Sequence, residues 1–512
     1  MVFVEVWPAV LAKTLLMRRI GLLGILAAFP LLLLAQHPVP KCLTPPGISP
    51  WLAHFQQHPE KYPTLRSTTG WMVPVTIHIT LGRNGERAIP IAQMLDAFCQ
   101  LNQDFQPTGI QFYIDQIRYI DRADYYDHTR IEQAINMMTT ENFPGTVNVY
   151  FVNTAVVEDA CGYNLVDQNR ESLGMTLAGS CTRGSNSNWA HEMGHYFSLP
   201  HTFNGWEGII HDYRLPAPEF VNNVPVERAD QSNCAVSGDG FCDTPPDYLN
   251  GRWYCAEDGN SSFIQRDPEN RAFRSDGSMI MSYAFDGCAD QFSPRQIMAM
   301  QNYLVSRRAN HLTPPPDQPG IRGVNMQLNF PISGETLSNN QLVQFDWEPI
   351  DGALGYILEI SMLPTFSVLH AQEFVFTAGH SLRNLPTNRT YYWRVRVFSR
   401  RNTCPSYSAV HSFDLRALTT STQSLSAVTS FQVQPNPITA GQHWTVQLRV
   451  QTTTTVTAEI RSMQGQQLQQ QVYTLNRGSQ MLTVPSAGIP AGMYWLRLHN
   501  SDGQVTRKVI VQ

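Results

Sequence analysis

The chain has 512 residues and a formal net charge of -5 at pH 7, with 42% hydrophobic and 15% charged residues. A single core rarely grows to this length, so we expect several domains. The hydrophobic content argues against a largely disordered chain. No block of Lys or Arg supplies the basic surface that nucleic-acid binding needs, which excludes nucleic acid as a partner.

The N-terminus has the pattern of a secretory signal peptide. Arg18 and Arg19 precede an apolar run over residues 20–35 that is shorter than a membrane-spanning helix requires. A permanent membrane anchor is the alternative interpretation of this run. We assign residues 1–36 to a leader, with Met17 as an alternative start.

Cysteine use agrees with export. Nine cysteines in an exported chain predict disulfides, and the odd number leaves at least one thiol without an intrachain partner. Residues 161–288 contain six of them, where we expect loop-rich walls that disulfides stabilise. Residues 37–70 are rich in proline, contain Cys42 in HPVPKCLTPPG, and are interpreted as a pro-segment with one short helix.

Residues 71–312 have the pattern of an α/β or α+β domain. The segment WMVPVTIHIT at 71–80 places Val75, Ile77 and Ile79 on one face, which predicts a strand with one buried side. After Pro90, apolar residues recur every three or four positions, as in an amphipathic helix. Further strands and helices alternate up to a histidine-bearing helix.

Two all-β modules follow. The proline-rich segment LTPPPDQPG at 312–320 predicts a stiff linker, because prolines fix the backbone and remove hydrogen-bond donors. Residues 321–416 alternate as strands around Trp347, Tyr356 and Trp393, and they resemble fibronectin type III or immunoglobulin-like sandwiches. After a Thr- and Ser-rich linker, residues 428–512 predict a second small β-sandwich.

The segment NWAHEMGHYFSLPHTF, residues 188–203, predicts a zinc site. His191 and His195 are four residues apart, so both imidazoles can reach one ion from the same helix face. Glu192 can act as general base toward a metal-activated water molecule. His201 supplies a third nitrogen if the helix ends before it, and Pro200 favours such an end.

These histidines have two alternative interpretations. They could be ordinary surface residues of a helix, although three at this spacing rarely occur by chance. The chain could also be a zinc peptidase whose third ligand is a distant glutamate, which the short spacing to His201 disfavours.

The motif HEMGHYFSLPH resembles the metzincin pattern, and most of all its pappalysin and cytophagalysin branch, over about residues 70–305. The segments GDGFCDTPPD at 238–247 and SMIMSYAFDGCADQF at 278–292 carry further resemblance. The resemblance implies a Met-turn at Met281 beneath the histidines and a Tyr283 that stabilises the oxyanion. Ser198 stands where the family has glycine, so we expect a non-glycine residue at positive φ there.

The same resemblance implies three further roles. Calcium is expected near Asp239, Asp243 and Thr244, with a solvated acidic loop as the alternative. Asp286 corresponds to the acidic base of the pocket for the residue after the scissile bond, which implies a preference for Arg or Lys; a turn aspartate is the alternative. Cys42 corresponds to a cysteine switch that keeps the enzyme latent, and a disulfide, for instance to Cys99, is its alternative.

Residues 428–512 resemble the C-terminal sorting domain of type IX secretion cargo. The resemblance rests on QPNPITAG at 434–441, AEIRSMQGQQL at 458–468 and the segment at 490–511. It implies passage through the periplasm, contact with outer-membrane secretion machinery, and a secreted or cell-surface protein. A purely structural β-module is the alternative.

Together these features predict a secreted zinc metalloendopeptidase that acts on proteins or peptides. The alternative from another class is a catalytically inert adhesin whose β-modules carry the function. An inert relative would be expected to lack Glu192 or one of the histidines, and all are present.

Overall fold

The computed structural model describes residues 42–65, 67, 70–156, 160–285, 287–312, 326–338, 342–401, 403–417, 425–463 and 465–512. The expected signal peptide, the alternative start and most of both linkers lie outside these residues. Within the described part of the chain, no helix combines the length and the apolar character needed to cross a bilayer. By its contacts the chain forms two compact units, of which the second contains residues 414–512.

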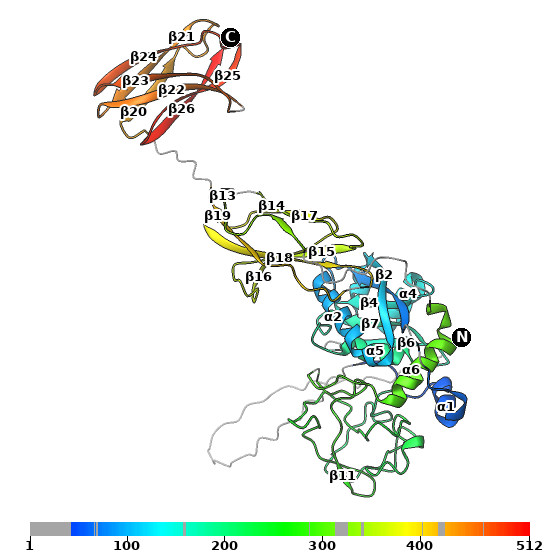
Figure 1. Ribbon diagram of the computed structural model, residues 1–512. Coiled ribbons are helices and arrows are strands. Elements are labelled where there is room, and N and C mark those ends of the chain that lie inside the picture. Colours follow the sequence, from blue (N-terminus) through cyan, green and yellow to red (C-terminus); the bar gives the residue numbers. More distant parts are fainter. Residues whose placement is uncertain are drawn as a thin grey trace, which may run out of the picture. The chain divides into compact units, whose positions relative to one another are not determined.

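A five-stranded sheet of order β2-β1-β4-β7-β6 organises the first unit (Figure 1). Neighbouring strands are parallel except for β6, the edge strand, which runs antiparallel to β7. The strands are β1 (Trp71–Thr80), β2 (Ile110–Ile120), β4 (Val147–Val152), β6 (Gly162–Val166) and β7 (Ser172–Ala178), with the short pair β3 (Asp127–His128) and β5 (Thr154–Ala155) beside them. The helices are α1 (Pro50–Gln57), α2 (Ile91–Asp104), α3 (Ala123–Tyr126), α4 (Ile131–Glu141) and α5 (Asn188–Tyr196), with 3-10 turns at Pro59–Lys61 and Gln106–Thr108.

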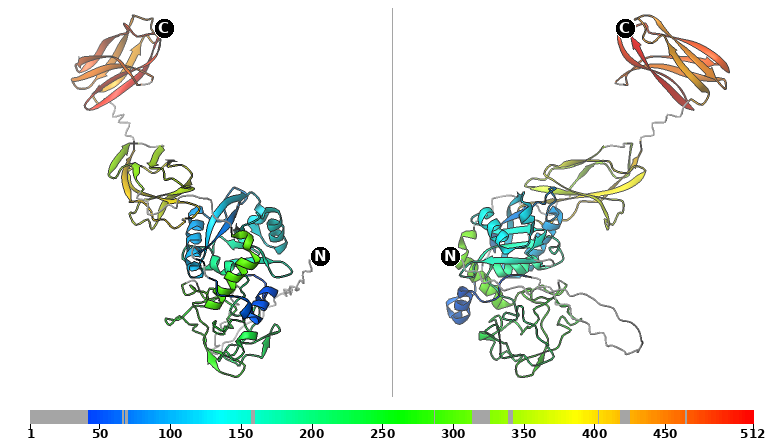
Figure 2. Two further views of the ribbon diagram at one scale, coloured as in Figure 1. Left: turned by 45° about the vertical axis from the view of Figure 1, so that its right-hand side comes forward. Right: turned by 180° about the vertical axis from the view of Figure 1, so that it is seen from behind.

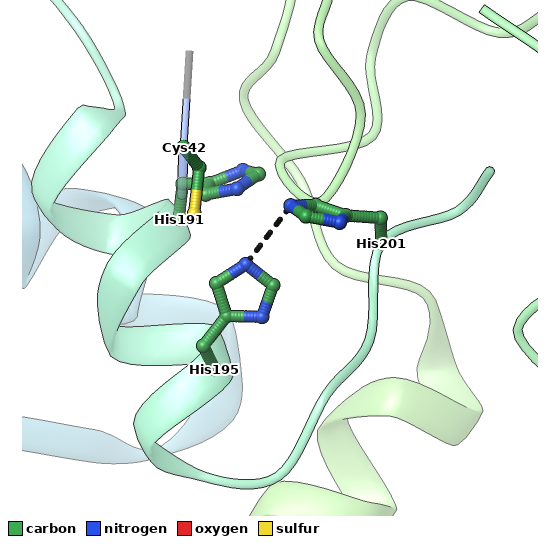
Figure 3. A group of neighbouring side chains, drawn as sticks. All are labelled: Cys42, His191, His195 and His201. Atoms are coloured by element: carbon green, nitrogen blue, oxygen red, sulfur yellow. Dashed lines mark hydrogen bonds between the residues drawn. The ribbon is translucent and has the colours of Figure 1, made fainter. Parts of the chain in front are cut away.

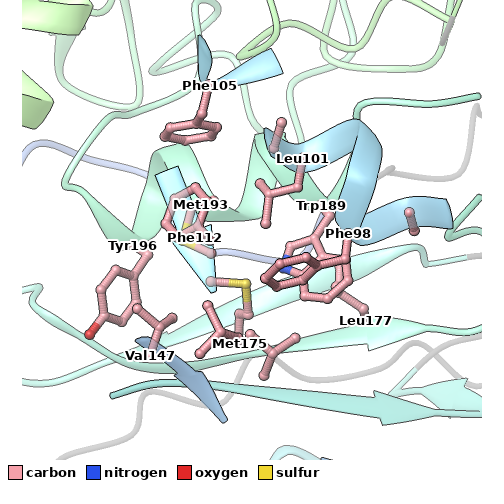
Figure 4. Packing of buried hydrophobic residues seen from close by; sticks show 14 of the residues in the cluster. Phe98, Leu101, Phe105, Phe112, Val147, Met175, Leu177, Trp189, Met193 and Tyr196 are labelled. Carbon is pink, nitrogen blue, oxygen red and sulfur yellow. The ribbon is translucent and has the colours of Figure 1, made fainter. Parts of the chain in front are cut away.

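Both faces of this sheet are buried. Val75, Ile77 and Ile79 of β1 belong to the main core together with apolar residues of α2 and α5. Figure 4 shows Phe98 of α2 beside Trp189 of α5 in this core. On the other face, Tyr150 of β4 packs with Met137 and Met138 of α4. The prediction that β1 buries one side only is therefore wrong. Thr76, His78 and Thr80 on its second face are also buried, because α3 and α4 pack over this side of the sheet.

His78 of β1 lies on that second face and is fully buried. Its ring stacks on Tyr150 with 4.2 Å between centroids, and its Nε2 lies 2.9 Å from Asn148 Oδ1. Burial, which outweighs the hydrogen bond to Asn148, lowers the pKa of His78 to about 4.

The free energy of unfolding is therefore expected to fall as the pH drops from about 6.5 to about 4. The unfolded chain binds a proton on His78 through this range, whereas the folded chain does so only near its lower pKa. Between pH 7 and pH 4.5 this one group lowers the free energy of unfolding by about 2 to 3 kcal/mol. Urea unfolding at both pH values, for wild type and His78→Gln, measures the effect. Equal pH dependence in the two proteins would contradict it.

The segment between α5 and the next helix has little regular structure and forms the irregular green part of Figure 1. Disulfides Cys161–Cys181, Cys234–Cys242 and Cys255–Cys288 link its loops and the adjoining sheet edge, as expected from the cysteine distribution. Its elements are β8 (Phe220–Val221), β9 (Val224–Pro225), the 3-10 turn Cys234–Val236, β10 (Gln265–Arg266) and β11 (Ala272–Phe273), followed by α6 (Pro294–Arg307) and the 3-10 turn Ala309–His311.

Residues 326–417 form two β-sheets, of order β12-β14-β17 and β13-β19-β18-β15-β16. Trp347, Tyr356 and Trp393 are buried there, as expected for a β-sandwich core. The strands are β12 (Leu328–Phe330), β13 (Glu335–Ser338), β14 (Leu342–Trp347), β15 (Gly355–Ser361), β16 (Leu369–Val375), β17 (Gly379–Arg383), β18 (Arg389–Phe398) and β19 (His411–Arg416).

This module is joined covalently to the first sheet region. Cys99 of α2 forms a disulfide with Cys404, 305 residues later. Arg396 pairs with Asp96 of α2, and the Ile114 N–H donates to the Arg400 carbonyl at 3.1 Å. The expected linker therefore does not make this module independent of α2.

The C-terminal unit is a β-sandwich with sheets β20-β21-β24 and β23-β22-β25-β26 (Figure 2). Its apolar core includes Trp444, Leu448, Leu496 and Leu498, supplied by alternating residues of the strands. The strands are β20 (Val428–Gln434), β21 (His443–Val450), β22 (Thr454–Ser462), β23 (Gln467–Leu475), β24 (Gly478–Pro485), β25 (Gly492–Asn500) and β26 (Gly503–Val511).

Candidate metal centre

Helix α5 places His191 and His195 on one face, and the chain leaves the helix after Tyr196, as predicted. The exit requires Ser198 to adopt φ 77°, a left-handed conformation that a glycine would take without strain. The Ser198 hydroxyl lies 2.6 Å from the Ser49 hydroxyl. The turn then brings His201 back toward the helix.

The three imidazole rings and the Cys42 thiol face a common centre (Figure 3). One potential ligand atom from each lies within 4.8 Å of the others, and all four residues are buried. No other group of three or more His, Cys, Asp or Glu in the described residues meets this condition. Two helix ligands, one loop ligand and one residue from the predicted pro-segment thus converge.

Each ring is held through its Nδ1 atom. His191 Nδ1 lies 2.7 Å from the Ile280 carbonyl, and His195 Nδ1 lies 2.7 Å from the Leu199 carbonyl. His201 Nδ1 lies 3.0 Å from Glu207 Oε1. Since Nδ1 donates to these acceptors, Nε2 carries the lone pair that a metal needs.

The donor set fits a zinc ion. His195 Nε2 and His201 Nε2 are 3.1 Å apart, close to the edge of about 3.3 Å expected for two nitrogens on a tetrahedral zinc. Burial, helped by the neighbouring His201, lowers the pKa of His195, which favours the neutral ring that binds metals. Three imidazoles and one thiolate are typical zinc ligands.

Met281 lies against the helix that carries these ligands. It is fully buried, and a Cβ atom at Gly194 would collide with its sulfur. Thr202, next to His201, donates its N–H to the Met281 carbonyl at 3.2 Å. Met281 therefore contacts both the helix and the segment that positions the third histidine.

Glu192 is buried beside the edge strand β6. Its Oε2 accepts a hydrogen bond from the Asn164 amide at 2.9 Å, and Ser172 donates to Asn164 Oδ1 at 2.6 Å. A Cβ atom at Gly162 would lie 3.0 Å from Glu192 Oε1 and 2.8 Å from the Thr176 carbonyl. This position is restricted to glycine because strand and carboxylate approach so closely.

The segment around Cys42 lies alongside the edge strand β6 and covers Glu192. Leu43 N–H donates to the Gly162 carbonyl at 3.0 Å, and the Thr44 hydroxyl lies 3.3 Å from Glu192 Oε2. The Tyr283 hydroxyl donates to the Cys42 carbonyl at 2.7 Å, and burial raises the pKa of this phenol, so it stays protonated. Tyr283 is thus occupied by the same residue whose thiol faces the histidines.

Cys42 is a free, buried thiol. The alternative of a disulfide to Cys99 is wrong, because Cys99 pairs with Cys404.

Comparisons with known proteins find relatives named extracellular metalloproteases. One relative, an extracellular metalloprotease of Arthroderma gypseum, is 24% identical over 216 residues, covering 39% of this chain and 61% of that protein. Another, of Arthroderma benhamiae, is 22% identical over 260 residues, covering 48% of this chain and 81% of that protein. This chain is similar to extracellular metalloproteases.

Residues 432–512 match the family of secretion system C-terminal sorting domains. The protein is therefore secreted or at the cell surface, as predicted. Among solved structures, the chain matches the FN1–FN3 domains of chicken CNTN1 at 13% identity and TM-score 0.20, covering 35% of this chain and 62% of that one. It also matches fibronectin(III)-like modules of Clostridium thermocellum CbhA at 8% identity and TM-score 0.18, covering 36% and 92%.

The expected calcium residues of this metalloprotease-like chain are only partly together. The Thr244 hydroxyl donates to Asp239 at 2.9 Å, whereas Asp243 accepts from Ser293 and from the Arg295 N–H at the start of α6. Burial raises the pKa of Asp239 to about 8, so a cation would be needed to keep it ionised at neutral pH. Calcium binding by this loop stays a prediction.

Sequence reasoning missed two residues that touch the centre, Asn164 and Glu207. Asn164 lies on β6, 28 residues before Glu192 of α5, and the contact depends on β6 lying at the sheet edge next to that helix. Glu207 lies six residues after His201, a spacing that no regular structure would bring into contact. Asp286, the expected specificity residue, lies outside the described residues.

Proposed function

We propose that this chain is a secreted zinc metalloendopeptidase of the metzincin type, related to the pappalysin and cytophagalysin branch, made as a latent precursor. The observation that carries the proposal is the convergence of His191, His195 and His201 with Glu192 alongside. The extracellular metalloprotease relatives support it.

The side chains have distinct roles in peptide hydrolysis. When bound, zinc supplies Lewis-acid polarisation of water and of the scissile carbonyl. Glu192 accepts the proton of the attacking water at its carboxylate and passes it to the leaving amine. Asn164 holds that carboxylate in place by its hydrogen bond. Tyr283 donates its hydroxyl hydrogen to the developing oxyanion once the Cys42 carbonyl is removed.

In the same proposal, the Cys42 thiolate occupies the position that the attacking water needs, and the protein is latent until this segment is displaced. Residues 42–44 also block the edge strand β6 through Leu43 and Thr44. The C-terminal sorting domain contacts the outer-membrane secretion machinery.

Casein hydrolysis by the purified, processed protein tests the proposal. We expect cleavage that a zinc chelator abolishes and added zinc restores. A chain that contains zinc but cleaves no protein would instead support the inert adhesin.

We also propose a preference for Arg or Lys immediately after the scissile bond, carried by Asp286. A carboxylate in that pocket would favour a cationic side chain through a charge-assisted hydrogen bond, about 10- to 100-fold over a neutral one. Cleavage profiling of a peptide library with wild type and Asp286→Ala measures this preference. If both proteins give the same profile, Asp286 has no part in specificity, and the metal centre is unaffected by that result.

A further inference from the structure

His201 differs from the other two histidines in how it is held. His191 and His195 are fixed by helix α5 and by backbone carbonyls. His201 lies on the loop beyond the helix, and its Nδ1 contacts the carboxylate of Glu207 at 3.0 Å. The loop ligand is thus the one whose partner carries charge.

Glu207 is itself fixed. Its Oε2 accepts the Gly205 N–H at 2.8 Å, so one oxygen is held by the loop while the other faces His201. The Asn222 amide donates to the carbonyls of Gly205 at 2.9 Å and Glu207 at 3.1 Å, which ties this loop to a neighbouring one. The side chain is 15% exposed, against 2% for His201. Water therefore screens the pair only weakly.

Packing completes the orientation of His201. Its ring stacks on Phe203 with centroids 4.5 Å apart and an angle of 10° between planes. Stacking fixes the plane of the ring but does not choose which nitrogen carries the proton. Glu207 makes that choice. Its carboxylate can only accept a hydrogen bond, so Nδ1 of His201 must carry the proton.

We propose that Glu207 is a positioning residue of the metal centre: it fixes the tautomer of His201 and, through its charge, strengthens His201 as a ligand. This inference rests on the proposed zinc site. A carboxylate behind a metal-bound histidine makes the imidazole more basic, and losing such a partner costs about 10- to 100-fold in metal affinity or activity. Backbone carbonyls behind His191 and His195 supply orientation without that charge.

Two substitutions separate orientation from charge. Glu207→Gln keeps an oxygen acceptor for Nδ1–H and removes the negative charge, whereas Glu207→Ala removes both. Asp212→Asn is a matched control, since Asp212 is an exposed acid of the same loop region that pairs with Arg214 and does not contact His201.

The test measures the zinc dissociation constant of the full-length protein by competition with a chromophoric chelator. It also measures the pH profile of kcat/KM of the processed protein, from which the Cys42 segment has been removed. We expect zinc binding 10- to 100-fold weaker in Glu207→Ala, an intermediate loss in Glu207→Gln, and no change in Asp212→Asn. We also expect the rise of kcat/KM with pH to occur at a lower pH in both Glu207 variants than in wild type. Removing a negative charge near the metal would make a water molecule bound there more acidic.

Equal zinc affinity in wild type and both Glu207 variants would overturn the inference, and so would an equal loss in Asp212→Asn. If Glu207→Ala does not fold, Glu207→Gln alone decides. A processed wild-type protein that binds zinc but hydrolyses no peptide contradicts the proposed function, and the inference is then decided by the affinity measurement alone. A wild-type chain that binds no zinc overturns both.

Discussion

Glu192→Ala is expected to keep its zinc and to lose about 10²- to 10⁴-fold in peptidase activity, the contribution typical of a general base. The substitution leaves all three histidines and their Nδ1 partners in place. It removes the carboxylate that faces both the Asn164 amide and the predicted attacking water. Metal analysis and peptide hydrolysis on the same sample measure the two halves of this expectation.

Glu192→Gln is the matched variant, because it keeps the volume of the side chain and an oxygen acceptor for Asn164. It should be as inactive as the alanine variant, since an amide cannot take the proton. Hydrolysis at the wild-type rate in either zinc-loaded variant would rule out Glu192 as the base.

Cys42→Ala is expected to produce a precursor that hydrolyses peptides without proteolytic processing, where the wild-type precursor does not. The thiol that faces the three histidines is removed, and the metal position it occupies becomes available to water. Activity should remain below that of the processed enzyme. This is because the backbone of the Cys42 segment is still held over the metal centre by hydrogen bonds of Leu43 and Tyr283.

Thr44→Val serves as the control for the Cys42 variant. It removes a hydroxyl of the same segment that contacts Glu192 and β6 but leaves the thiol. We expect this precursor to stay latent. A Cys42→Ala precursor that is as latent as wild type would show that the thiol has no role and that the segment covers the metal centre by its volume alone.

The arrangement of the helix ligands could be predicted from local spacing. A four-residue interval on a helix places His191 and His195 together in any fold, and Pro200 favours the observed helix end after Tyr196. The left-handed Ser198 was expected from the resemblance alone, because it stands where the metzincin pattern has glycine.

Contacts between distant segments could not be predicted in this way. The pairing of Asn164 with Glu192 depends on the sheet order, which places β6 at the edge next to α5. The Cys99–Cys404 disulfide joins two regions 305 residues apart, and nine cysteines allow many pairings. Burial of the second face of β1 depends on α4, which the pattern of β1 alone does not contain.

In the β-modules, too, local patterns predict the strands, whereas contacts between distant segments cannot be predicted from them. Alternation predicted the strands that contain Trp347 and Trp393, and both side chains are buried, because a pleated strand places every second residue on one face. The contact of Arg396 with Asp96 joins segments 300 residues apart in the chain, and no local pattern encodes it.

Zinc K-edge X-ray absorption on the purified precursor tests whether zinc is bound by the three histidines and Cys42, because it counts and identifies the atoms bound to the metal. We expect three nitrogen neighbours at about 2.0 to 2.1 Å and one sulfur at about 2.3 Å, with the sulfur absent in Cys42→Ala. A precursor without zinc, or a zinc ion whose neighbours do not include three nitrogens, would contradict it.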